Sequence, residues 1–148
     1  MKNKHLYYAL VILLTSLYSC KLLLPSVSNY DSYSYAQTTS VKVDALALMD
    51  MATEDYQSHQ KDIQTVQTNI QKIYEYEKHR PKNDFTTKQW QILTDTTGNL
   101  WGSFIIKWRT ESKLNKVYIS EKKKQIGTAF DQIAELESKK IKPADIKN

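Results

Sequence analysis

Apolar and helix-tolerant side chains recur at helical spacing between residues 45 and 73. They lie alternately four and three positions apart, which keeps one seam of a helix turned toward a partner. Ser40 or Thr39 can cap the start of this helix, and Pro81 ends it. The pattern predicts a helix over about 41–79, with a seam of Ala45, Met49, Ala52, Tyr56, His59, Ile63, Val66, Ile70 and Ile73.

A second helical run follows the corner at residues 80–84. Thr86 and Gln89 have the spacing of a capping box at its start. Gly98 and Gly102 interrupt it, so either the helix breaks near Thr97 to Asn99 or the glycines let another backbone approach closely. The large side chains of this run are expected in the core, and they are Trp90, Leu93, Leu100 or Trp101, Phe104 and Trp108.

A third apolar stripe runs from Leu114 to Ile141, and Pro143 ends it. Spacing alone does not decide whether the second and third runs form one helix. The fold prediction is all-α, an elongated antiparallel helical bundle or a long helical hairpin of two to three helices, in a single domain over residues 40–148. The predicted stripe consists of Val117, Ile119, Ile126, Ala129, Phe130, Ile133 and Leu136.

Residues 21–39 show neither helical nor alternating periodicity and are rich in Ser, Tyr and Asn. This composition favours a flexible, disordered tether. Tyr30, Tyr33 and Tyr35 could instead pack on the domain or lie at a lipid interface.

Cys20 is the only cysteine of the 148 residues, and it follows a short apolar segment. Lys2 and Lys4 precede that segment, and residues 6–17 are too few to span a bilayer. The run Leu17-Tyr18-Ser19-Cys20 resembles the lipobox of bacterial lipoproteins. The alternative is a secretory signal that happens to contain a cysteine. A single thiol in an oxidising compartment cannot form an internal disulfide, however, and lipidation would leave no free thiol.

The resemblance implies a signal peptide over 1–19, a lipidated Cys20 carrying palmitate-like chains, and a linker over 20–39. Lys21, in place of an Asp after the cysteine, implies the outer membrane, on its periplasmic face.

The net charge of the chain is +5. Loss of Lys2 and Lys4 with the signal lowers it to +3, which is too mild to indicate a nucleic-acid partner.

Residues 100–124 combine aromatic rings with a basic flank, a composition found in interfacial helices. The aromatic residues also have core-compatible spacing, which favours burial. The basic residues could pair with the acidic stretch before residue 60 across an antiparallel contact, or bind a membrane surface or an anionic envelope polymer. We expect the run from Lys122 to Lys124 to be exposed. The candidate interaction surface is Lys107, Arg109, Lys113, Lys116, Lys122, Lys123 and Lys124.

His59, with Asp55 and Asp62 nearby on the same predicted helix, is the best candidate for acid–base chemistry. No nucleophile lies at a recognisable spacing from it, so a polar interruption of the seam is the preferred interpretation. No Glu lies three residues before His59 or His79, as a helical di-metal site would require. The sequence therefore predicts no catalytic residue, metal or cofactor, and favours a binding or assembly component of the envelope with an unidentified protein partner.

Overall fold

The computed structural model describes residues 26–146, and the predicted signal peptide and Cys20 lie outside them. The described part is helical and contains no strand, which confirms the all-α prediction. Its α-helices are α2 (Ser32–Asp50), α3 (Gln60–Lys78), α4 (Asp84–Thr94), α5 (Trp101–Glu111) and α6 (Lys116–Glu137). Three short 3₁₀-helices complete it, namely η1 (Met51–Thr53), η2 (Tyr56–His59) and η3 (Pro143–Asp145).

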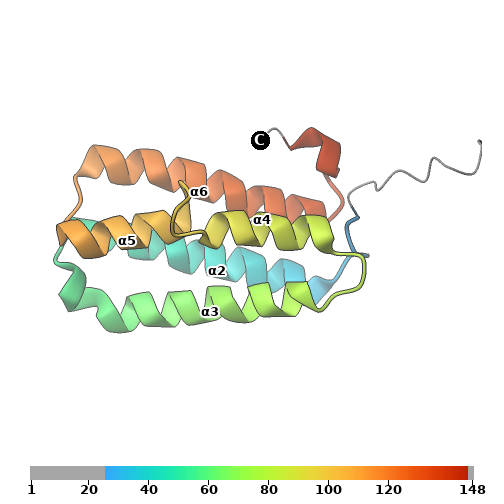
Figure 1. The fold of residues 1–148 in the computed structure, drawn as a ribbon, viewed down its shortest axis with the longest axis horizontal. Coiled ribbons are helices and arrows are strands. Elements are labelled where there is room, and N and C mark those ends of the chain that lie inside the picture. The colour runs from blue at the N-terminus through green and yellow to red at the C-terminus, as the bar shows by residue number, and fades with distance from the viewer. Residues whose placement is uncertain (1–25, 147–148) are drawn as a thin grey trace, which may run out of the picture.

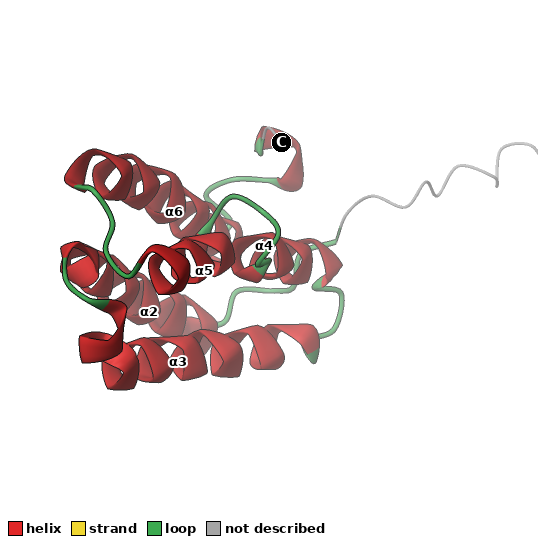
Figure 2. Cartoon of the chain, turned by 60° about the vertical axis from the view of Figure 1, so that its left-hand side comes forward, coloured by secondary structure: helices red, strands yellow, loops and turns green. Residues whose placement is uncertain are grey.

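These helices form four antiparallel arms, because α4 and α5 follow one another along a single arm (Figure 1). Helix α2 packs on α3 and α6, and α4 packs on the same two helices, so each arm has two neighbours. Figure 2 shows the same arrangement from a direction closer to the helix axes. The result is an up-down-up-down bundle, and the prediction of two to three helices was too low.

The large aromatic residues fill the core, as the spacing predicts. Trp90, Phe104 and Trp108 are fully buried, and Trp90 meets Phe130 edge-on with ring centroids 5.9 Å apart. Val117 is the exception in the predicted stripe, since it is 70% exposed. It lies in the first turn of α6, two positions before the buried Ile119 and therefore on the opposite side of the helix.

The predicted continuous helix over 41–79 is wrong, because the chain breaks between α2 and α3. The Asp55 carboxylate accepts hydrogen bonds from the Gln57 amide at 2.8 Å and the Ser112 hydroxyl at 2.5 Å. The Leu114 amide donates to the Ala52 carbonyl at 2.7 Å. The α5–α6 connection thus supplies hydrogen-bond donors to the carbonyl and carboxylate groups that have no partner within a helix at the break. The seam stays buried because α3 folds back on α2.

Helix α2 begins at Ser32, so the predicted linker is wrong for residues 32–39. The Asp31 carboxylate caps the helix by accepting from the amides of Tyr33 and Ser34 at 2.8 and 3.1 Å. Ser34 and Thr38 are buried against the neighbouring arms. A polar sequence is helical here because capping and tertiary packing outweigh its weak propensity.

Both alternatives predicted for Gly98 and Gly102 are confirmed, a helix break and a close backbone approach. The chain leaves the helix between α4 and α5, and a Cβ on Gly102 would lie only 2.2 Å from the Thr94 carbonyl oxygen. The predicted capping box is wrong, since α4 begins at Asp84 and Thr86 is buried within it. Helices α5 and α6 are separate, because Ser112 adopts a left-handed conformation with φ of 63°.

Asp31 also gives the fold a dependence on pH. The Tyr76 hydroxyl, 2.6 Å from the carboxylate, and the Ser34 amide hold the pKa of Asp31 below 3.8. A carboxyl group whose pKa is lower in the folded than in the unfolded state stabilises the fold at pH values above its unfolded-state pKa. This contribution is lost as the pH falls through its folded-state pKa. We expect Asp31→Asn to flatten the loss of stability between about pH 5 and pH 2, measured by urea unfolding. Asp44→Asn, an exposed change on the same helix, should leave that loss as it is in the parent; an unchanged profile for Asp31→Asn would contradict the assignment.

Candidate functional site

The predicted basic surface begins on α5 and continues along the first half of α6. The α5–α6 connection lies at the end of the bundle opposite the start of α2 (Figure 1). Ion pairs occupy part of the surface. Lys107 pairs with Glu111, whose carboxylate raises the pKa of Lys107 by hydrogen bonding, and Lys123 binds Asp50 at 2.6 Å.

The prediction that Lys122 is exposed is wrong. Its side chain is buried, with 8% of the residue exposed. The ammonium group donates to the Asn99 carbonyl at 2.9 Å, to the Asn99 side chain and to Gln125 Oε1 at 3.0 Å. These three acceptors match the three donors of a lysine, which makes its burial tolerable. Lys122 therefore fixes the α4–α5 connection on α6 and belongs to no interaction surface.

The remaining lysines of α6 line a hollow of about 570 Å³ beside the end of α2. Lys116, Lys123 and Lys124 contribute three cationic groups, and Asp50 contributes one carboxylate. Lys116 and Lys124 are exposed and form no ion pair within residues 26–146. The hollow therefore carries an excess of positive charge that attracts anions. Its other lining residues are Thr53, Ile119 and Ser120.

Arg109 and Lys113 are exposed near the same end of the bundle. The Ser112 hydroxyl, the Gln57 amide and, to a smaller extent, the charge of Lys113 lower the pKa of Asp55. Together with the pair between Lys123 and Asp50, this shows that the acidic and basic stretches do meet, as the charge pattern indicates. Arg109, Lys116 and Lys124 remain available to a partner.

The three largest aromatic residues of the segment lie in the core, whereas Tyr118 is half-buried, with the Lys107 ammonium 5.2 Å from its ring centroid. Trp101, Phe104 and Trp108 are buried, and the Trp108 indole donates to the Glu54 carbonyl at 3.0 Å. The expectation from their spacing is thus confirmed. The segment therefore forms no interfacial helix with fully exposed rings, and its surface presents charged side chains of both signs together with the apolar Val117.

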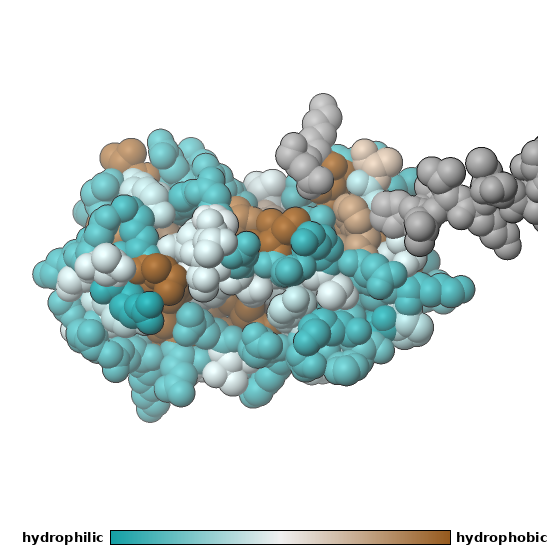
Figure 3. Space-filling view, in the orientation of Figure 1, coloured by the Kyte–Doolittle hydropathy of each residue, from teal (hydrophilic) through white to brown (hydrophobic). Residues whose placement is uncertain are grey.

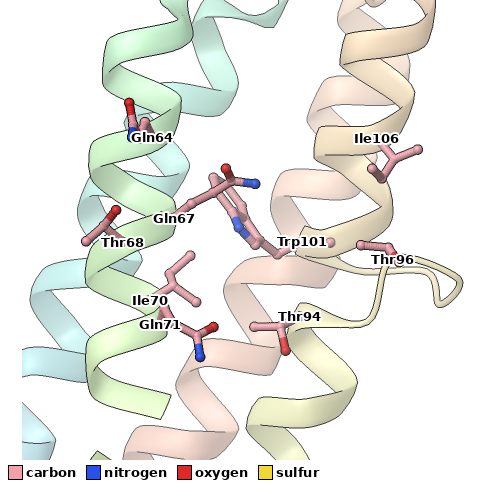
Figure 4. A pocket seen from close by; sticks show the side chains of 10 residues that line it. Gln64, Gln67, Thr68, Ile70, Gln71, Thr94, Thr96, Trp101 and Ile106 are labelled. Atoms are coloured by element: carbon pink, nitrogen blue, oxygen red, sulfur yellow. The ribbon is translucent and has the colours of Figure 1, made fainter. Parts of the chain in front are cut away.

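A second hollow, of about 360 Å³, lies between α3 and the α4–α5 connection (Figure 4). Gln64, Gln67 and Gln71 project from α3 over a floor that includes Trp101 and Ile70. No charged residue lines it. On the face drawn in Figure 3, hydrophilic residues predominate and apolar ones show between the arms. Such a lining suits neutral hydrogen-bonding groups.

The three residues of the predicted acid–base group are only partly brought together, since Asp62 lies near His59 and Asp55 does not. The His59 Nε2 lies 2.9 Å from Glu54 and its Nδ1 lies 4.0 Å from Asp62, whereas Asp55 is turned to Ser112. The imidazole also lies 5.7 Å from the Trp108 ring. These contacts tie the start of α3 to the break before it. Across the described range, no group of three or more His, Cys, Asp or Glu side chains is placed to hold a metal ion.

A buried polar cluster that sequence reasoning missed lies at the opposite end of the bundle. The Arg80 guanidinium pairs with the Glu77 carboxylate at 3.0 Å and also with Glu137, and the side chains of both glutamates are fully buried. Ser34 and Asn83 donate to Glu77. The spacing of Glu77 and Arg80 could have indicated a pair on one helix, but nothing local points to Glu137. We call these five residues the Arg80 cluster.

The Arg80 cluster also holds the chain that precedes α2. The Asp31 amide donates to Glu137 at 2.5 Å, and Arg80 donates to the Asn29 carbonyl at 2.5 Å. Ser28 donates through its amide to Asn83 at 3.4 Å and through its hydroxyl to the Pro81 carbonyl. Residues 26–31 are therefore fixed at this end and do not belong to a free linker.

None of the α-helices between residues 26 and 146 has both the length and the apolar character needed to cross a membrane. Comparisons of the whole chain with protein-family models, with curated proteins and with solved structures find no match.

Proposed function

We propose that this protein is a small lipid-anchored component of the bacterial cell envelope, attached through Cys20, that binds a partner through the far end of its bundle. The leader and the lipobox-like run before Cys20 support the anchor. The observation that carries the binding role is the separation of two ends. Residues 26–31 are fixed at one end, and the lysine-lined hollow lies toward the other.

The length of α6 sets this separation. The helix has 22 residues, which corresponds to about 33 Å at 1.5 Å per residue. Its C-terminal end contacts residues 26–31 through Glu137, and Lys116 stands at its first residue. A partner at the hollow would therefore bind away from the anchored end. If Lys21 directs the protein to the outer membrane, binding would take place on the periplasmic side of that membrane.

The charge of the hollow favours an anionic partner. Lys116 and Lys124 can reach carboxylates on an envelope protein, which is the partner we favour. An anionic envelope polymer is the alternative that the same lysines support. The membrane surface is a weaker alternative for this end of the bundle, since Trp101, Phe104 and Trp108 beside the lysines are buried. We propose no catalysis, metal, cofactor or nucleic-acid partner.

One labelling experiment tests the anchor and the partner separately. Cells producing tagged protein are fed labelled palmitate and crosslinked before purification. We expect Cys20→Ala to abolish the label. Lys116→Glu with Lys124→Glu should keep the label and reduce the crosslinked envelope protein at least tenfold, because charge reversal places carboxylates against carboxylates.

The matched control is Lys61→Glu with Lys72→Glu, two exposed lysines on α3 away from the hollow. This variant should retain both the label and the crosslink. Persistent labelling of Cys20→Ala would refute the anchor. An equal loss of crosslinking in the hollow variant and its control would refute the assigned binding end.

A further inference from the structure

We infer that the anchored end of the bundle lies against phospholipid headgroups through a surface of its own, so that the domain stands upright on the membrane. This inference rests on the lipid anchor proposed at Cys20. The anchor-end surface is formed by Tyr30, Tyr33, Lys82, Lys139, Lys140 and Lys142.

The chain before α2 is held in place where it joins the domain. The Phe85 amide donates to the Ser26 carbonyl at 3.2 Å, and the Ser26 hydroxyl donates to Asp84 at 3.2 Å. With the contacts of Ser28 and Asp31 described above, these bonds hold residues 26–31 along the end where α3 meets α4 and α6 finishes. Any anchor before Ser26 must pull on this end.

The chain between the proposed anchor and Ser26 is short. Only residues 21–25 separate Cys20 from Ser26, and a fully extended chain of that length reaches about 20 Å. Helix α2 alone, with 19 residues, is about 28 Å long. The anchored end must therefore stay close to the bilayer. The far end is separated from it by more than the length of this tether.

The anchor-end surface exposes two aromatic rings. Tyr30 is 56% exposed and Tyr33 is 53% exposed, although both are large rings. Tyr33 meets Tyr76 edge-on with centroids 4.9 Å apart, and Tyr30 lines a hollow of about 470 Å³ with Val27, Asn29 and Lys82. Tyrosine is enriched at membrane–water interfaces because its ring is apolar and its hydroxyl is hydrated.

The anchor-end surface also carries positive charge. Lys82, Lys139, Lys140 and Lys142 are exposed and form no ion pair within the described range. The Lys139 ammonium donates only to the neutral Asn29 side chain, at 3.2 Å. The nearby carboxylates of Asp84 and Asp145 accept hydrogen bonds from within the domain, from the Ser26 hydroxyl and the Lys142 amide. Lysines beside exposed tyrosines match the anionic headgroups of a bilayer.

The uniqueness of Cys20 makes the test direct, because any added cysteine is then the sole free thiol. Lipidated mature protein carrying Lys140→Cys or Lys113→Cys is labelled with a fluorophore and reconstituted into vesicles of phosphatidylethanolamine and phosphatidylglycerol. The vesicles include a lipid with a nitroxide on its headgroup. We expect quenching at position 140 to exceed that at 113 at least fivefold. Adding Tyr30→Ser and Tyr33→Ser should reduce the quenching at 140 at least twofold.

Val117→Ser, at an exposed apolar position on the far half of the bundle, is the matched control and should leave the quenching unchanged. Flotation with the vesicles separates the two proposals. Protein that floats but is quenched equally at both positions, or is unaffected by the tyrosine changes, would overturn the docking surface and leave the anchor standing. Protein that does not float would overturn the anchor, and the docking surface with it.

Discussion

Replacing Gly102 by Ala is expected to lower the free energy of unfolding by about 3 kcal/mol, toward the upper end of the usual effect of overpacking. The added Cβ would lie 2.2 Å from the Thr94 carbonyl oxygen and 2.6 Å from two backbone atoms of Asp95. Backbone atoms cannot move aside as the end of a flexible side chain can. Urea unfolding followed by circular dichroism would measure the loss, with a fall in Tm of roughly 10 °C.

Gly127→Ala is the matched control for this change. Gly127 lies inside α6, and a Cβ there would meet only the Leu46 side chain, at an ordinary 3.6 Å. Alanine favours a helix over glycine by about 1 kcal/mol, so this variant should be neutral or more stable. Equal effects of the two substitutions would show that the approach of α5 to the end of α4 is not as close as described.

Arg80→Met is expected to destabilise the fold by about 3–5 kcal/mol, since it leaves two buried carboxylates without their cation. Glu77 and Glu137 come from α3 and α6, and Arg80 joins them at the end of the bundle. Methionine keeps much of the apolar stem of arginine, so the loss reports on the charge more than on packing. Thermal and urea unfolding at neutral pH would measure it.

Two further variants separate charge from other effects. Arg109→Met removes an exposed arginine on α5 and should change stability by less than about 0.5 kcal/mol. Adding Glu137→Gln to Arg80→Met removes one of the two uncompensated charges and should recover part of the loss. If Arg80→Met and Arg109→Met unfolded alike, the Arg80 cluster would not be a buried ionic centre.

The helical seam was predictable because burial follows spacing even where the helix does not continue. Ile63, Val66, Ile70 and Ile73 are buried as predicted, and so are Ala45 and Met49 across the break. The break itself has no proline or glycine to indicate it. It depends on the α5–α6 connection, which supplies partners for Ala52 and Asp55 from about 60 positions away in the chain.

The missed features all depend on partners distant in sequence. Ser34 is helical and buried because its hydroxyl donates a hydrogen bond to the Glu77 carboxylate. Lys122 is buried because its ammonium group donates hydrogen bonds to Asn99. Spacing rules place such polar residues on the surface, since they carry no information on a distant acceptor. The basic surface was therefore predicted too large, and the Arg80 cluster was not predicted at all.

The fixing of residues 26–31 has a mechanical consequence. If Cys20 carries the proposed anchor, a tension on it would enter the bundle at Ser26, Ser28 and Asp31, whose bonds lead to α3, to α4 and its N-cap, and to α6. The load would be shared by several arms before the first turn of α2 could be unwound. A domain held in this way would follow movements of the bilayer as a rigid body.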